Sequence, residues 1–185
     1  MATLILAGVI GYLVGAISPA TLIAHARGID LTTMGSGNPG ASNAGRVMGR
    51  KTGVLVALLD VAKGAIPAAG FDVVDHRASL IAGLAAVVGH VTSPYLRGRG
   101  GKGVATAAGA VLGSHPLWVV FVLVTWVVVL GASRWIALAS ICAALAVLVT
   151  AVVAGHDVWW AAVITVIVVL RHTRNVVRRL RPQAD

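Results

Sequence analysis

Long apolar runs, separated by short polar segments, limit what this chain of 185 residues can fold into. Residues 3–24 and 47–69 are each long enough for a helix that crosses a bilayer. Charged residues make up 11% of the chain, against roughly 25% in soluble domains, and the mean hydropathy is +0.91. The sequence therefore predicts an all-α, polytopic integral membrane protein, with residues 1–185 forming a single membrane-embedded domain. Because no basic stretch precedes the first run, we expect a retained helix there and not a cleaved signal peptide.

The number of membrane crossings depends on residues 105–131, an apolar run that is interrupted at Ser114-His115-Pro116. A single crossing would divide the arginines between both faces of the membrane. Two crossings place nearly all basic residues on one face, as the positive-inside tendency favours. We therefore expect about seven segments, some of them short, with the N-terminus outside and the C-terminus in the cytoplasm. The other segments are expected at residues 3–24, which Ser18-Pro19 bends, and at 47–69, 78–91, 135–155 and 159–170.

A polar segment rich in small residues, 35–46, lies between the first two apolar runs. Its glycines allow unusual backbone conformations, and Pro39 forbids a helix through its middle. A loop of this kind turns backbone N–H groups inward and binds anions, whereas the plain alternative is a connector between two helices. The residues expected to face a ligand are Ser36, Gly37, Asn38, Gly40, Asn43 and Arg46.

A second polar segment, residues 92–106, follows His90 and contains the run Gly100-Gly101-Lys102-Gly103 before the next apolar run. This order suits a phosphate, because backbone N–H groups and a helix N-terminus would face the anion. The order of a Walker A loop is missing, and the alternative is a capping turn with a snorkelling lysine. The candidate residues are His90, Gly100, Gly101, Lys102, Gly103 and Thr106.

The third candidate cluster is His172 with Asn175, which lie three positions apart and therefore on one helical face. The alternative is an interfacial helix end whose basic residues meet anionic lipid. We expect only that lipid contact from Arg178, Arg179 and Arg181.

These three clusters together resemble the bacterial acyl-phosphate-dependent glycerol-3-phosphate acyltransferases of the PlsY type. The family's SGNxGAxN loop and following arginine correspond to residues 36–43 and Arg46, and its GH…GGKGVAT segment corresponds to residues 89–90 and 100–106. Its RHxxN segment corresponds to residues 171–175. Residues 60–64 are also similar, so the resemblance runs nearly end to end with the motifs in order.

The chain departs from this family at a few positions. Pro39 stands in place of the usual isoleucine, and Ser42 replaces threonine. Ala137 stands where the family often has serine, so Ser140 is the candidate for that substrate contact. The glutamate usual near the end of the family's tail is missing, and only Asp185 is available there.

The resemblance implies acyl transfer from an acyl phosphate to the 1-hydroxyl of sn-glycerol 3-phosphate, which gives lysophosphatidic acid and phosphate at the first acylation step of phospholipid biosynthesis. Ser36 and Arg46 would orient glycerol 3-phosphate, while Lys102 and the Gly100–Gly103 backbone would hold the departing phosphate. His172 and Asn175 would orient substrate, with His172 or a substrate phosphate oxygen accepting the hydroxyl proton. The resemblance further implies the cytoplasmic face of the bacterial inner membrane, an acyl-phosphate-producing enzyme as partner, no nucleic acid and no cofactor. No carboxylate cluster stands in the sequence to bind a metal.

Two other functions deserve comparison. His25 and Asp30 have the spacing of the His-x4-Asp motif in acyl-CoA-dependent acyltransferases, a weak match without that family's neighbouring motifs. Asp60 and Lys63, inside an apolar run, could mark the pathway of an organic-phosphate transporter, or could form a buried ion pair on one helix. No internal repeat of the kind common in transporters is visible in the sequence.

Overall fold

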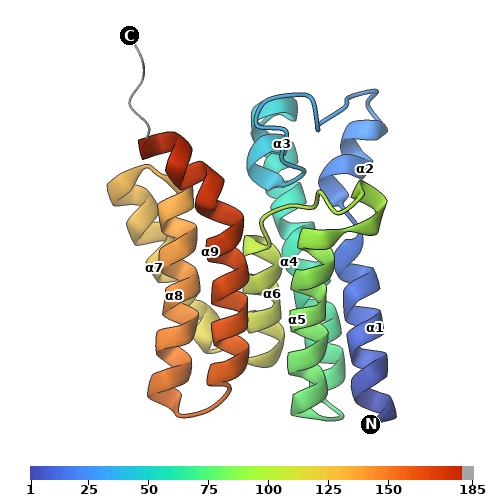
Figure 1. Ribbon diagram of the computed structural model, residues 1–185, viewed down its shortest axis with the longest axis vertical. Helices are drawn as coiled ribbons and strands as arrows, with labels where there is room; N and C mark the ends of the chain where they lie inside the picture. The colour runs from blue at the N-terminus through green and yellow to red at the C-terminus, as the bar shows by residue number, and fades with distance from the viewer. Residues whose placement is uncertain (181–185) are drawn as a thin grey trace. The chain divides into compact units, whose positions relative to one another are not determined.

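The computed structural model describes residues 1–180, and every regular element within that range is helical (Figure 1). The all-α prediction is therefore confirmed. Five stretches of helix are long and apolar enough to cross a membrane, and α6 and α7 are shorter apolar helices. The elements are α1 (Ala2–Ala16), α2 (Pro19–His25), α3 (Ala41–Met48), α4 (Arg50–Asp72), α5 (His76–Thr92), the 3₁₀ turn η1 (Pro94–Leu96), α6 (Val104–Ser114), α7 (Trp118–Ser133), α8 (Ile136–Ala154) and α9 (Val158–Leu180).

The helices form two compact units, of which the first ends at Pro116 and the second begins at Leu117. In the first unit, α1 packs along α5, and α4 packs along both α5 and α6. In the second, α7 packs on α8 and α8 packs on α9. The single domain over residues 1–185 stays a prediction.

Close packing in the first unit depends on glycines that let helices approach each other. A Cβ on Gly11 or Gly15 of α1 would collide with backbone of α5, and a Cβ on Gly64 of α4 would collide with the Thr106 carbonyl of α6. A Cβ on Gly109 of α6 would likewise collide with backbone of α4. In a bilayer, where burying apolar surface gives little drive for association, small residues at helix contacts allow the van der Waals packing that holds helices together.

Helix α4 shows how side chains are distributed between the interior and the outer surface. Leu58 is 63% exposed and Ile66 is 69% exposed, whereas Asp60 and Lys63 on the same helix are buried. Ionisable residues in transmembrane segments face the protein interior, and large apolar residues face lipid. The exposed apolar face of α4 therefore fits a lipid environment.

The predicted bend at Ser18-Pro19 is confirmed, because α1 ends at Ala16 and α2 begins at Pro19. Ser18 is extended and caps α2, its Oγ accepting a hydrogen bond from Thr21 N at 3.3 Å. Proline disfavours helical conformation in the residue before it, which explains the break. The Ile17 carbonyl beside the break accepts a hydrogen bond from Lys63 Nζ at 2.7 Å.

The interruption predicted at Ser114-His115-Pro116 is also confirmed. α6 ends at Ser114 after 11 residues, and α7 begins at Trp118 and runs for 16 residues. Residues 105–131 thus hold two short helices in place of one long one, which agrees with the count of about seven apolar segments.

The prediction for the first polar segment was wrong. Residues 35–46 were expected to be a loop throughout, but α3 begins at Ala41 and carries both Asn43 and Arg46. Pro39 lies upstream of the helix, and Gly40 takes the extended N-cap conformation, so nothing opposes helix formation after it. The helix of the last crossing, α9, extends past Leu170 to Leu180, and it includes His172 and Asn175, which were expected on one helical face. Arg181 and Asp185 lie outside the described residues.

Candidate active site

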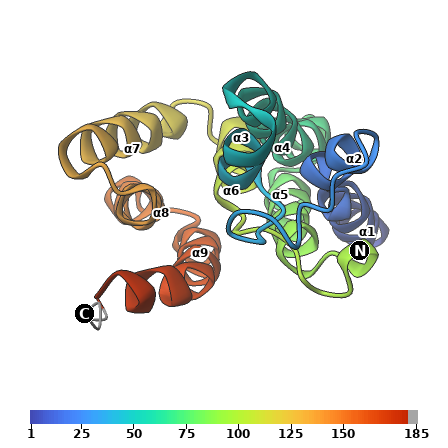
Figure 2. The same ribbon diagram turned by 90° about the horizontal axis from the view of Figure 1, so that it is seen from above.

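The first two candidate clusters lie at the same end of the first unit. In Figure 1 the segment before α3 and the loop after η1 are both at its upper end, and Figure 2 shows the segment before α3 running across that end beside α5. The short turns before α5 and after α6 lie at the opposite end. The fold therefore gathers two polar segments that are more than fifty residues apart in the sequence.

Asn43 fastens the segment before α3 onto that helix. The side chain is 1% exposed, and its Oδ1 accepts a hydrogen bond from Ser36 N at 2.8 Å. Its Nδ2 donates to the carbonyls of Met34 at 3.0 Å and Leu31 at 3.3 Å. All of these bonds are internal to the protein, so Asn43 shapes the loop that carries Ser36. Its direct contact with substrate stays a prediction.

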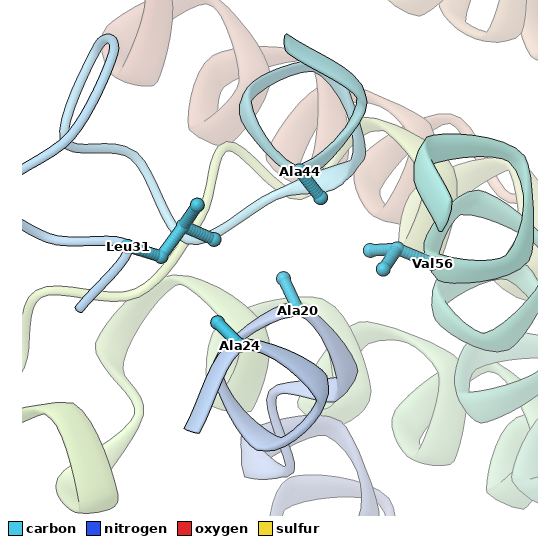
Figure 3. Packing of buried hydrophobic residues seen from close by; sticks show 5 residues of the cluster. All are labelled: Ala20, Ala24, Leu31, Ala44 and Val56. Carbon is cyan, nitrogen blue, oxygen red and sulfur yellow. The ribbon is translucent and has the colours of Figure 1, made fainter. Parts of the chain in front are cut away.

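A small apolar cluster beneath the loop fixes its position. Figure 3 shows the side chains of this cluster pointing toward one another from α2, α3, α4 and the loop itself. Each of these side chains is at most 1% exposed. The members are Ala20, Ala24, Leu31, Ala44 and Val56. The polar segment is thus anchored to three helices and is not a loose connector.

Ser36 and Arg46, the two residues expected to orient glycerol 3-phosphate, are joined through Asn43. Arg46 Nη1 donates to Asn43 Oδ1 at 3.3 Å, the same oxygen that accepts from Ser36 N. Both side chains are exposed and accessible to a ligand. Gly37 has a φ of +68°, and a Cβ there would lie 2.8 Å from the Thr32 carbonyl, so the tight turn beside Ser36 requires glycine.

Asn38 and Gly40 complete this segment. Asn38 is half-buried, and its Nδ2 lies 2.9 Å from the position that a Cβ on Gly40 would take. Gly40 is the N-cap of α3, and its carbonyl accepts from Asn43 N and Ala44 N at 3.1 and 3.0 Å. Their backbone places the start of α3 beside Ser36.

Residues 100–103 form a glycine-rich turn that leads directly into α6. Gly100 and Gly101 are buried, and Lys102 is half-buried. Gly103, with φ +81°, is the N-cap of α6. Lysine beside a helix N-terminus is suited to binding a phosphate, since backbone N–H groups and the ammonium would act on the same anion. Thr106 is fully buried in the first turn of that helix.

His90 lies behind this turn and not in open contact with solvent. It is 7% exposed, and its Nδ1 is 3.5 Å from Asp60 Oδ1. Gly101 N donates to the His90 carbonyl at 3.1 Å, and a Cβ on Gly101 would collide with imidazole Nε2. The ring therefore supports the turn from within. Substrate contact by His90 stays a prediction.

The second unit holds the third cluster. His172 is 1% exposed, and its Nδ1 lies 2.8 Å from the Val168 carbonyl. A carbonyl only accepts, so Nδ1 carries a proton and the neutral ring has its lone pair on Nε2. Asn175 is half-buried one turn further along α9. Ser140 on α8 is buried, and its hydroxyl donates to the Ile136 carbonyl at 2.8 Å.

The structure also shows the contacts of the residues on which the two alternative functions depend. Asp60 Oδ1 lies 2.9 Å from Lys63 Nζ, which confirms the buried ion pair. Asp30 Oδ1 accepts from the hydroxyl and the N–H of Thr32 at 2.6 and 2.9 Å, in an exposed turn after α2. The sequence reading missed that His90 joins the Asp60–Lys63 pair. In the sequence, this network was indicated only by the position of Asp60, Lys63 and His90 within apolar runs.

Residues 5–182 match the family model described as glycerol-3-phosphate acyltransferase. A glycerol-3-phosphate acyltransferase from Aquifex aeolicus is 38% identical over 179 residues, which cover 93% of both chains. One from Geobacter sulfurreducens is 41% identical over 178 residues, covering 93% of this chain and 91% of the relative.

Solved structures of PlsY, an integral membrane glycerol 3-phosphate acyltransferase, are also similar to this chain. The glycerol 3-phosphate form matches with a TM-score of 0.91 and 36% identity over 96% of this chain and 92% of that one. The lysophosphatidic acid form matches with a TM-score of 0.88.

Proposed function

Because this chain belongs to the glycerol-3-phosphate acyltransferase family and is a multi-pass membrane protein, we propose that it transfers an acyl group from an acyl phosphate to the 1-hydroxyl of sn-glycerol 3-phosphate. The products are lysophosphatidic acid and inorganic phosphate. One observation supports the choice of donor: two separate polar segments, each with backbone N–H groups and a cation suited to a phosphate, lie at one end of the first unit, so each of two phosphorylated substrates can have its own.

Glycerol 3-phosphate binds at the segment before α3. The Arg46 guanidinium supplies charge and several N–H donors to the phosphate, and Ser36 supplies a hydroxyl. Asn43 holds Ser36 and Arg46 in fixed positions, because its Oδ1 accepts from both. Such fixed positions bring the substrate hydroxyl close to the acyl carbon at little further entropic cost.

The phosphate of the donor binds at residues 100–103. The glycerol 1-oxygen attacks the acyl carbon, and the bond between that carbon and the phosphate oxygen breaks. The departing phosphate keeps the bonding electrons, and Lys102 with the N-terminus of α6 stabilises its added charge. Phosphate leaves readily from a mixed anhydride, so the reaction requires no covalent enzyme intermediate.

The hydroxyl proton goes to His172 or to a phosphate oxygen of the substrate. In His172, the Nδ1 proton is used by the Val168 carbonyl, which leaves Nε2 as the basic nitrogen. Asn175 on the same face of α9 orients the substrate, and Ser140 provides a further polar contact. These roles of His172, Asn175 and Ser140 are part of the proposal.

We place the reaction on the cytoplasmic face of the bacterial inner membrane. Basic residues in the segments around α3, in the loop before α6, between α7 and α8 and at the end of α9 then lie on one side, as the positive-inside tendency favours. The acyl chain stays in the bilayer while both phosphates remain at this face. An enzyme that produces acyl phosphate supplies the donor.

The test is an assay of purified protein with radiolabelled glycerol 3-phosphate and either palmitoyl phosphate or palmitoyl-CoA, after EDTA treatment. We expect product from palmitoyl phosphate and none from palmitoyl-CoA. Formation of product by detergent-solubilised protein also excludes a purely transporting role. Efficient use of the CoA thioester, with no reaction from the acyl phosphate, would contradict the proposal and favour the His25/Asp30 alternative.

A further inference from the structure

We propose that Asp60 is a positioning residue, which acts through His90 to hold residues 100–103 in their phosphate-binding conformation. The inference rests on the proposed function, in which this turn takes the phosphate of the donor. Asp60 lies inside α4 and is 3% exposed, so it reaches neither substrate nor solvent directly.

Three buried polar side chains form a continuous network in the first unit. Asp60 Oδ1 lies 2.9 Å from Lys63 Nζ and 3.5 Å from His90 Nδ1. Lys63 and His90 are 6% and 7% exposed. Lys63 Nζ also donates to the Ile17 carbonyl, at 2.7 Å, where α1 gives way to α2. The network thus joins the α1–α2 break to α4 and α5.

The opposite side of His90 supports the turn. Gly101 N donates to the His90 carbonyl at 3.1 Å. A Cβ on Gly100 would collide with that carbonyl, and one on Gly101 would collide with imidazole Nε2. The turn therefore rests on both the backbone and the ring of His90, and any rotation of the ring would displace the atoms that precede Lys102.

Asp60 fixes the orientation of that ring. A carboxylate beside Nδ1 favours a proton on Nδ1 and holds this edge of the imidazole toward α4, which keeps the Nε2 edge against Gly101. A buried ion pair by itself contributes little net stability, because desolvation offsets its attraction. The pair lies directly behind the turn at residues 100–103. Positioning that turn accounts for the buried pair better than a contribution to stability does.

A matched pair of double variants isolates the interaction with His90. Asp60→Asn/Lys63→Met and Asp60→Leu/Lys63→Met remove the same two charges, so neither leaves an unpaired buried ion. Only the asparagine variant retains an oxygen that accepts from His90 Nδ1. The protein is purified whole, and inorganic phosphate is the probe, read as the rise in unfolding temperature with phosphate and as inhibition of acyl transfer.

We expect the asparagine variant to retain most of the phosphate effect. The leucine variant should bind phosphate on the order of tenfold more weakly and show a raised KM for palmitoyl phosphate, because a displaced turn loses its alignment. The KM for glycerol 3-phosphate should change little, since the hydrogen bonds that shape its segment come from Asn43. Equal phosphate effects in the two variants, or no effect in the unchanged protein, would overturn the inference.

Gly101→Ala provides a second route that leaves Asp60 and Lys63 in place, in case the leucine variant does not fold. Its methyl group would collide with imidazole Nε2 from the side of the turn, so the same loss of phosphate binding is expected. Phosphate binding like that of the unchanged protein would count against the inference. A protein that binds phosphate through this turn yet transfers no acyl group from palmitoyl phosphate would instead refute the proposed function alone.

Discussion

At the scale of single residues, Arg46 and Lys102 are the cationic groups of the two segments that we propose bind phosphate. Replacing either with alanine should lower kcat/KM by at least about a hundredfold, the scale of losing a group that stabilises charge in the transition state. The sequence placed both residues in loops, whereas Arg46 is on α3, which Asn43 and the apolar cluster hold in place. Arg50→Ala, at an exposed position near by, serves as the control. Near-normal turnover in either variant would remove that residue from the site.

A substitution at Asn43 tests whether the geometry of the segment before α3 matters for activity. Asn43→Asp keeps the acceptor for Ser36 N but places a carboxylate against the carbonyls of Met34 and Leu31. Loss of two buried hydrogen bonds costs about 1–3 kcal/mol, so the unfolding temperature and the affinity for glycerol 3-phosphate should both fall. Unfolding in detergent and the KM for each substrate are the measurements. An unchanged KM for glycerol 3-phosphate would show that substrate binding at Ser36 does not depend on the two hydrogen bonds from Asn43 Nδ2.

Substitutions at His25 and Asp30 test whether the His-x4-Asp motif takes part in acyl transfer. Hydrogen bonds from the Thr32 hydroxyl and N–H hold the pKa of the Asp30 carboxyl below its usual range, so this carboxylate stays ionised and engaged in its own turn. His25→Ala and Asp30→Asn should each keep activity within about threefold, because exposed substitutions of this kind usually change free energies by less than about 0.5 kcal/mol. A loss of several hundredfold in either variant would bring the His-x4-Asp chemistry back.

At the scale of helices, the contact between α4 and α6 gives a direct stability test. Gly64→Ala would push a methyl group into the Thr106 carbonyl, whereas Gly70, on the same helix, has no atom within 4 Å of its Cβ position. Gly64→Ala should destabilise the protein by about 1–3 kcal/mol, the usual cost of overpacking. Gly70→Ala should be neutral or slightly stabilising, because alanine favours helix. Equal unfolding temperatures for the two variants would show that α4 and α6 separate without cost.

The helices were predictable from the sequence where local chemistry marks them. Pro19 and Pro116 stand where helices break, and the apolar runs at 47–69, 78–91 and 135–155 match α4, α5 and α8 closely. α3 was missed because it follows directly on a segment of glycine, asparagine and proline, and its apolar positions Ala41, Ala44 and Met48 cover barely two turns. The bonds that shape the site were also hidden, because Asn43 reaches the Leu31 carbonyl and Lys63 reaches the Ile17 carbonyl across long sequence separations.

At the scale of the whole molecule, the proposed orientation in the membrane can be tested by labelling. In a Cys142→Ala background, Asn38→Cys and Thr173→Cys probe the segment before α3 and the end of α9. With both on the cytoplasmic face, each should react in intact cells only with a membrane-permeant reagent. An even number of crossings between the two positions is required for this result. Ready labelling of either cysteine from outside by an impermeant reagent would contradict the topology.

The shortness of α6 has a consequence for how the donor reaches the enzyme. An α-helix of 11 residues rises about 16 Å, roughly half of the ~30 Å hydrocarbon thickness of a bilayer. A helix this much shorter than its surroundings thins the local bilayer or leaves its end below the headgroup level. The N-terminal end of α6 carries the turn that contains Lys102. Where the bilayer thins to match α6, an acyl phosphate, the donor that we propose, would meet the Lys102 turn at headgroup depth as it moves laterally in the leaflet, and its hydrocarbon tail would stay in the lipid phase.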